Sequence, residues 1–177
     1  FRTLGCKMNA LDSARLGAAL QAGGMYPAED ETEADIVFVN SCTVTNRADR
    51  QSRQEAHRAR RQGKQLAIFG CGPKVEKAKW QAAFPGALIF GGDAELLAHF
   101  GIDADELDYP LADRTRLPVA IQTGCDNLCT FCITRVARGK AQDFPVEGIL
   151  RQIRRAEAIG VQEVVLTGIQ LASWGCT

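Results

Sequence analysis

The sequence has few histidines, no long apolar run and no excess of charge of either sign. Only His57 and His99 occur in 177 residues, so a zinc site that combines cysteine with histidine has few candidates. No apolar stretch approaches the roughly 18 residues of a membrane helix, and the first residues lack the pattern of a signal peptide. Lys and Arg number 21, as do Asp and Glu, so contact with a polyanion requires local clustering of positive charge.

Cysteine, in contrast, occurs seven times. An odd number in a chain of this length does not favour a disulfide framework, which is typical of smaller secreted proteins. Thiolate ligands in a reducing cytoplasm fit better, so we expect a cytoplasmic protein. The chain is 46% hydrophobic and 24% charged, which predicts a soluble globular protein with a core, as one sizeable domain or two small ones.

Short apolar runs alternate with helical patterns over the first hundred residues. The expected strands are Phe1–Leu4, Ile36–Val39, Leu66–Phe69 and Ala87–Phe90. Three helices are expected. The first is capped by Asn9 or Asp12 and has an apolar face of Leu11, Ala14, Ala18 and Ala22, which Leu16 and Leu20 widen. The other two are expected over Val44–Gln62 and Val75–Ala83. This alternation predicts an α/β fold with an open parallel sheet flanked by helices, of the flavodoxin-like or Rossmann-like kind.

A charged, turn-rich stretch at 101–118 is the expected linker between a domain at 1–100 and one at 119–177. It contains Asp103, Asp105, Glu106, Asp108 and Pro110. The second domain is expected to begin with a strand at Val119–Ile121 and a second strand at Val164–Leu166. Between them we expect a helix opened by Pro145 and closed by Gly160, with one face formed by Val146, Ile149, Leu150, Ile153 and Ala156. The first residue is not Met and the last strand is followed at once by the chain end, so we expect a fragment.

Three cysteines at Cys125, Cys129 and Cys132 have the spacing C-x3-C-x2-C. Three thiolates this close in sequence can hold three irons of a [4Fe–4S] cluster, which ordinarily takes four cysteines. If no fourth protein ligand is supplied, one iron stays open to a small molecule that carries its own ligand atoms.

Another three cysteines, Cys6, Cys42 and Cys71, each follow the end of an expected strand. Because the carboxyl ends of parallel strands lie along one edge of the sheet, we expect these residues to meet there. The preferred interpretation is a second thiolate site with three protein ligands. Two alternatives are buried thiols without a ligand role and a zinc site, for which a histidine is lacking at this edge. Cys176 receives no role.

Positive charge clusters between Arg47 and Lys64, where seven of the 21 basic residues lie. On a helix they fall within an arc of roughly 160°, opposite Ala48, Ala56 and Ala59. The cluster is either a solvated helix face or a surface that contacts RNA phosphates. The candidate RNA contacts are Arg50, Arg53, His57, Arg61 and Lys64.

Together these motifs resemble the methylthiotransferase family of radical S-adenosylmethionine (AdoMet) proteins. The loop of three cysteines, with Phe131 before the last one, is similar to the radical AdoMet signature, and Gly5-Cys6, Ser41-Cys42 and Gly70-Cys71 match the family's upstream domain. The opening Thr3-Leu4-Gly5-Cys6-Lys7-Met8-Asn9 is most similar to the branch that modifies threonylcarbamoyladenosine 37 of tRNA. The isopentenyladenosine and ribosomal-protein branches usually differ after that cysteine.

The resemblance implies a first cluster, on Cys125, Cys129 and Cys132, that binds AdoMet and cleaves it to a 5′-deoxyadenosyl radical. It implies a second [4Fe–4S] cluster, on Cys6, Cys42 and Cys71, that carries the sulfur to be methylated and inserted at C2 of adenosine 37 in the tRNA anticodon loop. An electron donor such as flavodoxin or ferredoxin is implied as well. Arg138, Thr167 and Gly168 match family positions around AdoMet.

The chain departs from the family after Cys71, where Pro73-Lys74 replaces a common Ala-Gln, and after Cys132, where Thr134-Arg135-Val136 stands. Compared with the family, it holds only the start of a radical AdoMet partial barrel, so we expect no turnover from this chain alone. Alternatives are a methylthiotransferase for isopentenyladenosine 37 or for a ribosomal protein. Two alternatives of another class are a zinc-dependent RNA-binding module and a two-cluster electron-transfer protein.

Overall fold

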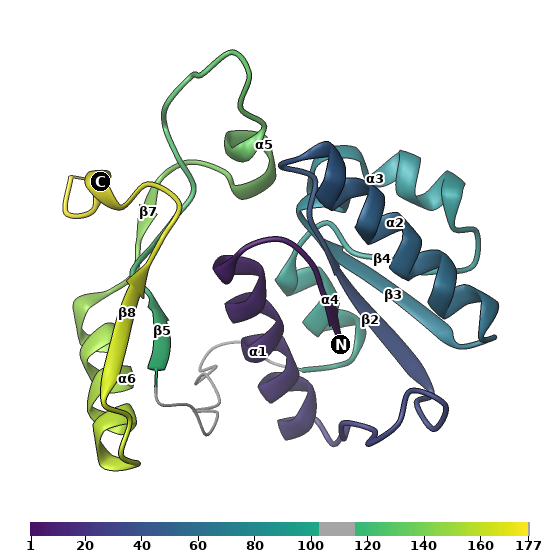
Figure 1. The fold of residues 1–177 in the computed structure, drawn as a ribbon, viewed down its shortest axis with the longest axis horizontal. Helices are drawn as coiled ribbons and strands as arrows, with labels where there is room; N and C mark the ends of the chain where they lie inside the picture. Colours follow the sequence, from purple (N-terminus) through teal and green to yellow (C-terminus); the bar gives the residue numbers. More distant parts are fainter. Residues whose placement is uncertain (103–115, 177) are drawn as a thin grey trace. The chain divides into compact units, whose positions relative to one another are not determined.

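The computed structural model describes residues 1–102 and 116–176, which form two compact units, Phe1–Leu107 and Asp108–Thr177. Most of the expected linker at 101–118, including Asp103, Asp105, Glu106, Asp108 and Pro110, lies outside the described residues. Each unit is built on its own parallel strands (Figure 1).

The first unit contains a four-stranded parallel sheet with the strand order β1-β2-β3-β4. The strands are β1 (Arg2–Thr3), β2 (Ile36–Ser41), β3 (Gln65–Gly70) and β4 (Leu88–Ile89). The two central strands are almost continuously apolar because they are buried on both faces. The predicted α/β fold with an open parallel sheet is therefore confirmed.

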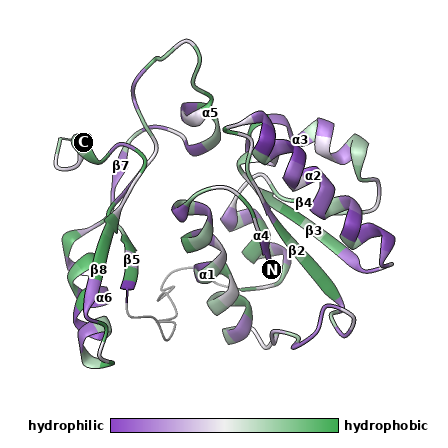
Figure 2. Cartoon of the chain, in the orientation of Figure 1, coloured by the Kyte–Doolittle hydropathy of each residue, from purple (hydrophilic) through white to green (hydrophobic). Residues whose placement is uncertain are grey.

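Helices cover both faces of this sheet (Figure 1). α1 (Lys7–Ala22) and α4 (Asp93–His99) pack on one face, where Leu16, Leu20, Phe38 and Phe69 form the core. α2 (Asn46–Arg61) and α3 (Cys71–Ala83) pack on the other, around Val39, Ile68, Trp80 and Phe84. Figure 2 shows the resulting pattern, with hydrophobic central strands and a hydrophilic α2.

The start and the buried face of α1 differ from the prediction. The helix begins at Lys7 with Cys6 at the N-cap, so Asn9 and Asp12 lie inside it and neither caps it. Its buried apolar residues are Met8, Leu11, Leu16, Ala19 and Leu20, whereas Ala14 and Ala18 are half-buried and Ala22 is exposed. The prediction was right for Leu11, Leu16 and Leu20 and wrong for the three alanines, because small residues are found on every side of this helix.

The next two helices also begin at other residues than predicted. α2 begins at Asn46, where Thr45 caps it by accepting a hydrogen bond from the Ala48 amide at 3.2 Å. Ala56 and Ala59 are buried against the sheet, as expected. α3 begins at Cys71 rather than Val75 and is interrupted at Glu76, which has non-helical backbone angles.

In the second unit, β5 (Arg116–Ala120) pairs in parallel with β8 (Glu163–Thr167), and α6 (Val146–Ala158) connects them. This confirms the predicted strand–helix–strand unit. Leu117, Val119, Ile149 and Ala156 are in its core, but Val146 and Leu150 are exposed, contrary to the predicted face. Three short elements were not predicted: the antiparallel pair β6 (Gln122–Thr123) and β7 (Gln142–Asp143), and α5 (Thr134–Arg138).

A short 3₁₀ helix at Leu171–Ser173 follows β8. Among the described residues, no helix is both long and apolar enough to span a membrane.

Candidate metal centres

The cysteines of the first unit follow three strands that are neighbours in the sheet. Cys42 and Cys71 come directly after β2 and β3, whose last residues, Ser41 and Gly70, are paired in register. Cys6 follows β1 after a short turn. Cys42 and Cys71 are buried and Cys6 is exposed, so the three strand ends differ in their access to solvent.

Gly5 allows the turn before Cys6 to approach the end of β2. Its φ of +98° is in the left-handed region, and a Cβ atom placed on it would lie 2.6 Å from the Cβ of Cys42 and 2.8 Å from its Sγ. Only glycine fits both the backbone angle and the close approach. The turn that carries Cys6 is therefore in direct contact with Cys42.

The Asn9 side chain lies close to the sulfur atoms of Cys6 and Cys71. Its Oδ1 atom is 3.9 Å from the Sγ of Cys6 and 3.7 Å from the Sγ of Cys71. Its Nδ2 atom donates to the main-chain oxygens of Leu4 at 2.8 Å and Ser41 at 3.0 Å, and the side chain is fully buried. Asn9 was predicted as a possible helix cap and as the last residue of the family motif, but nothing local in the sequence marks it as a neighbour of two cysteines.

The backbone of Cys42 is fixed by helix α2. Its amide donates to the Oγ of Ser52 at 3.0 Å, and that hydroxyl donates in turn to the carbonyl of Ala48 at 2.8 Å. Ser52 is fully buried and was also missed from the sequence. The first turns of the basic helix are thus tied to the end of β2.

The donors at this edge are three free cysteines, and sulfur is the donor that iron–sulfur clusters take. Within residues 1–102 and 116–176, no three His, Cys, Asp or Glu side chains converge closely enough to hold one metal ion. His57 packs on Phe84 and His99 on Phe90, both away from the thiols.

The second group of cysteines lies on the loop between β6 and α5. Gly124 opens this loop with a φ of +70°, and any side chain there would overlap the main chain of Lys140. The amide of Cys125 donates to the Gly139 carbonyl at 3.1 Å, and the amide of Cys132 donates to the Cys129 carbonyl at 3.1 Å. The loop is thereby closed at its base, while Cys129 and Cys132 remain exposed.

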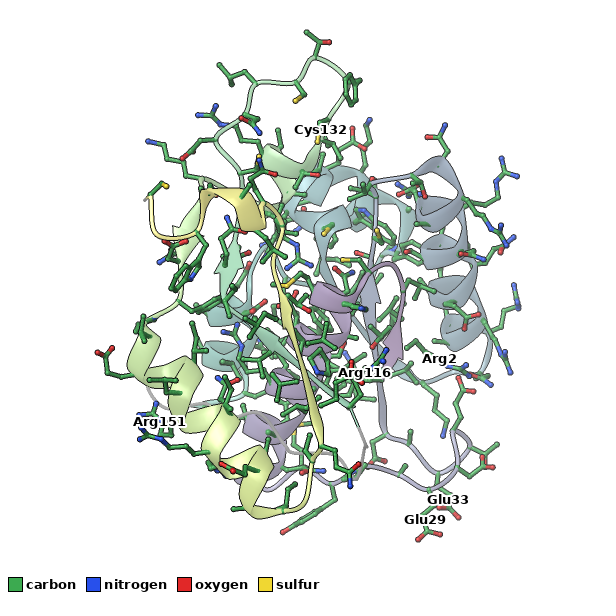
Figure 3. The ribbon with its side chains drawn as sticks, turned by 60° about the vertical axis from the view of Figure 1, so that its left-hand side comes forward. Arg2, Glu29, Glu33, Arg116, Cys132 and Arg151 are labelled. Carbon is green, nitrogen blue, oxygen red and sulfur yellow. The ribbon has the colours of Figure 1, made fainter. Side chains whose placement is uncertain are left out.

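Cys132 lies next to the first residue of α5 (Figure 3). Hydrogen bonds from the side chain and then the amide of Thr134 lower the pKa of its thiol below the ordinary value. A thiol with a lowered pKa is more readily converted to the thiolate that binds iron. Thr134, one of the departures from the family pattern, is therefore compatible with a ligand role for Cys132.

Gln122 joins the base of the cysteine loop to the segment after β8. This fully buried side chain donates through Nε2 to the carbonyls of Thr123 at 2.8 Å and Gly124 at 2.9 Å. Its Oε1 accepts from the amides of Ile169 at 3.0 Å and Gln170 at 2.8 Å. The bonds from Ile169 and Gln170 come from a segment far along the chain and leave no local pattern in the sequence. The role of Gln122 was therefore not predicted.

The candidate AdoMet residues lie in the same unit as this loop. Thr167 is the buried last residue of β8, where its carbonyl accepts from the Ile121 amide at 2.9 Å. A Cβ on Gly168 would lie 3.1 Å from the Cβ of Gln122, so Gly168 packs closely against the base of the loop. Arg138 is the last residue of α5.

The basic residues of α2 and its C-terminal turn do not form one uniform surface. Arg50, His57 and Arg61 are exposed, whereas Arg53 and Lys64 are half-buried. The Arg53 side chain packs on Trp80, and Lys64 donates to the Thr32 carbonyl at 2.6 Å. Arg50 and Arg61 are therefore the arginine candidates most accessible to a partner.

Comparisons with known proteins cover nearly the whole chain. Residues 1–91 match the family described as uncharacterized protein family UPF0004, and residues 119–170 match the radical SAM superfamily. The threonylcarbamoyladenosine tRNA methylthiotransferase MtaB of Bacillus subtilis is 34% identical over 99% of this chain and 44% of its own length. A putative methylthiotransferase of Helicobacter pylori is 36% identical, over 99% and 45%.

A tRNA-2-methylthio-N(6)-dimethylallyladenosine synthase of Leifsonia xyli is 35% identical over 98% of this chain and 37% of its own length. The chain thus spans less than half the length of these curated relatives. The UPF0004 match covers the α/β unit with Cys6, Cys42 and Cys71, and the radical SAM match covers the cysteine loop. The chain belongs to the UPF0004 family, and its residues 119–170 match the radical SAM superfamily.

Proposed function

We propose that the protein is a tRNA methylthiotransferase that adds a methylthio group at C2 of N6-threonylcarbamoyladenosine 37. The observation that carries this proposal is the presence of two separate cysteine triads, one gathered from three strand ends and one on a single loop. We assign the domains to 1–100 and 119–177, joined by a linker at 101–118. The reducing cytoplasm, where thiolates persist, is the proposed compartment.

Cys125, Cys129 and Cys132 would hold a [4Fe–4S] cluster that leaves one iron for AdoMet, since this loop supplies three thiols. When bound, the cluster and AdoMet supply the one-electron chemistry that an inert aromatic C–H bond requires. The chain's own contribution is positioning, because the Gly139 carbonyl closes the loop and Gln122 ties its base to residues 169–170. Thr167, Gly168 and Arg138 are proposed to surround AdoMet.

Cys6, Cys42 and Cys71 would hold the second cluster, which supplies the sulfur that is transferred. The close approach of Gly5 to Cys42 and the position of Asn9 beside Cys6 and Cys71 support a common site. With three protein ligands, this cluster also keeps one iron open, which a sulfur donor requires and an electron carrier does not. Because Cys6 is exposed, the proposed site would be reachable from solvent.

The proposed partners are the anticodon loop of tRNA and an electron donor such as flavodoxin or ferredoxin. Arg50, His57 and Arg61 on the exposed side of the basic segment are the proposed phosphate contacts. Ser52, on the same helix, is bonded to the backbone of Cys42. RNA bound along α2 would therefore lie on the helix that fixes one ligand of the sulfur-carrying cluster.

The threonylcarbamoyl branch is favoured by the sequence from Thr3 to Asn9 and by the similarity to the Bacillus relative. Relatives named for dimethylallyladenosine have similar identity, so isopentenyladenosine 37 is the second candidate substrate. The nucleosides of tRNA from a strain that lacks the gene decide between them. Loss of the methylthio mark on threonylcarbamoyladenosine is expected, and loss on isopentenyladenosine instead would contradict the substrate assignment.

Iron and sulfide counting after anaerobic reconstitution tests the two-cluster assignment on this chain. We expect about eight irons per chain, the content of two [4Fe–4S] clusters. The triple variants Cys6→Ala/Cys42→Ala/Cys71→Ala and Cys125→Ala/Cys129→Ala/Cys132→Ala are each expected to retain about half, one cluster. Stoichiometric zinc without iron would support the RNA-binding alternative and refute the proposal.

A further inference from the structure

In the described part of the chain, the Asn9 side chain contacts all three cysteine-bearing segments at the sheet edge. Through Nδ2 it bonds Leu4, which precedes the turn of Cys6, and Ser41, which precedes Cys42. Through Oδ1 it lies within 4 Å of the sulfurs of Cys6 and Cys71. These segments are far apart in sequence, so their relative positions depend on contacts of this kind.

The direction in which the amide points is also fixed. A carboxamide nitrogen carries two hydrogens, and two main-chain carbonyls accept from Nδ2 at 2.8 and 3.0 Å. The oxygen end of the amide dipole must therefore face the sulfurs. Reversing the amide would leave the Leu4 and Ser41 carbonyls without these donors and would place an oxygen against them.

We propose that Asn9 is a positioning residue for the second cluster. Its side chain holds the segments of Cys6, Cys42 and Cys71 in one arrangement, and its amide oxygen faces the sulfur atoms of Cys6 and Cys71. The inference rests on the proposed second cluster and goes beyond it by naming the side chain that assembles the site. Outer residues that orient metal ligands typically contribute 10- to 100-fold to metal affinity. Asn9 would do so through its two Nδ2 bonds to Leu4 and Ser41, because an amide oxygen cannot accept a hydrogen bond from a thiolate. The negative end of a dipole near a cluster disfavours added electrons, so Asn9 lowers the reduction potential.

The test compares Asn9→Ala with Asn40→Ala in the chain that carries Cys125→Ala, Cys129→Ala and Cys132→Ala, so that only the second cluster can form. Asn40 is a matched control because it is also a fully buried asparagine. It donates to the Asn9 main-chain carbonyl at 2.8 Å and to the Ser13 Oγ at 3.0 Å, and among the described residues it makes no hydrogen bond to a cysteine sulfur. Circular dichroism and thermal melting measure the fold of each variant.

The first measurement is iron release to a chelator, and the second is the midpoint potential of the reconstituted cluster. We expect Asn9→Ala to release iron about 10-fold faster than its parent and to shift the potential to a more positive value. Asn40→Ala is expected to lose stability while it keeps both properties of the parent. If Asn9→Ala does not fold, Asn9→Ser, whose side chain is too short to reach the sulfurs, is judged by the same two measurements.

Three results would overturn the inference. Parental iron retention and potential in a folded Asn9 variant would refute the role of Asn9 and leave the cluster assignment intact. Equal iron loss in the Asn9 and Asn40 variants, in proportion to their loss of stability, would show that Asn9 affects iron binding only through the stability of the fold. Failure of the parent with the intact sheet-edge triad to take up any iron would refute both the inference and the proposed second cluster.

Discussion

The guanidinium carbon of Arg53 lies 4.5 Å from the centroid of the Trp80 ring. Arg53 also pairs with Asp49, with its Nε 2.9 Å from a carboxylate oxygen. Trp80 is almost fully buried beneath it. Arg53 therefore joins α2 to α3, and its charge is already engaged within the protein, unlike the charges of the exposed Arg50 and Arg61.

We predict that Arg50→Gln/Arg61→Gln weakens tRNA binding by the full protein. Each lost phosphate contact is expected to reduce the slope of log K against log salt concentration by about 1. The measurement is a titration of tRNA at several salt concentrations. Arg151→Gln is the control, since Arg151 is an exposed arginine on α6 (Figure 3), and it should leave the slope unchanged. An unchanged slope in the double variant would show that this face is merely solvated.

Gly5→Ala should disrupt the sheet-edge site. The positive φ alone costs about 1–2 kcal/mol for a residue with a side chain, and the new Cβ would press on Cys42. We expect a lower denaturant midpoint and loss of the iron held by Cys6, Cys42 and Cys71. Gly63→Ala is the matched control.

Gly63 also has a positive φ, +70°, but its Cβ would have open space. It should therefore show the backbone cost with no loss of iron. Equal iron contents in the two variants would mean that the contact with Cys42 is unimportant for the site.

Gln122→Leu should destabilise the second unit by more than a surface substitution. It removes four hydrogen bonds of a buried amide, and each buried group left unpaired costs about 1–3 kcal/mol. Urea unfolding followed by circular dichroism measures the loss. Gln142→Leu, at an exposed position of β7, is the comparison, and a similar small effect of both would contradict the assigned network.

The pH dependence of Cys132 can be followed in the chain without a cluster. Thr134 lowers the pKa of this thiol, so its alkylation should begin at a lower pH in the folded chain than in urea. The hydrogen bonds from Thr134 to the Cys132 thiolate stabilise the fold at pH values above the ordinary pKa of the thiol. This stabilisation is lost as the pH falls through the lowered pKa of the folded chain. Mass spectrometry of the labelled peptide gives the rate at each pH.

Thr134→Val removes the hydroxyl, which is the larger cause, and should move this pH profile upward. Thr130→Val, at an exposed position of the same loop, should leave the profile in place. An unchanged pH profile in Thr134→Val would show that the Thr134 hydroxyl does not lower the pKa of Cys132.

The sequence was sufficient for the order of the main parallel strands and for the position of each upstream cysteine after one of three neighbouring strands. Continuous apolar runs mark buried parallel strands, and residues that follow such strands share one edge of the sheet. The alanines on the buried face of α1 could not be predicted, because alanines of similar character lie on several of its sides.

Asn9 and Gln122 could not be identified because their function depends on partners far along the chain. Ser41 is 32 residues from Asn9, and Gln170 is 48 residues from Gln122. A polar side chain at such a position has the same local pattern as one that faces solvent. The tertiary structure alone distinguishes the two.

The two triads differ in what must happen before they can bind iron. Cys125 and Cys132 are close in sequence, so their loop can gather thiols in a largely unfolded chain. The sheet-edge triad comes together only after β1, β2 and β3 have paired. The chain therefore loses the loop-closure entropy of that pairing before Cys6, Cys42 and Cys71 can bind iron. A cluster at the sheet edge would bind the native state alone and shift the folding equilibrium towards it, so iron uptake there reports the maturation of the whole sheet.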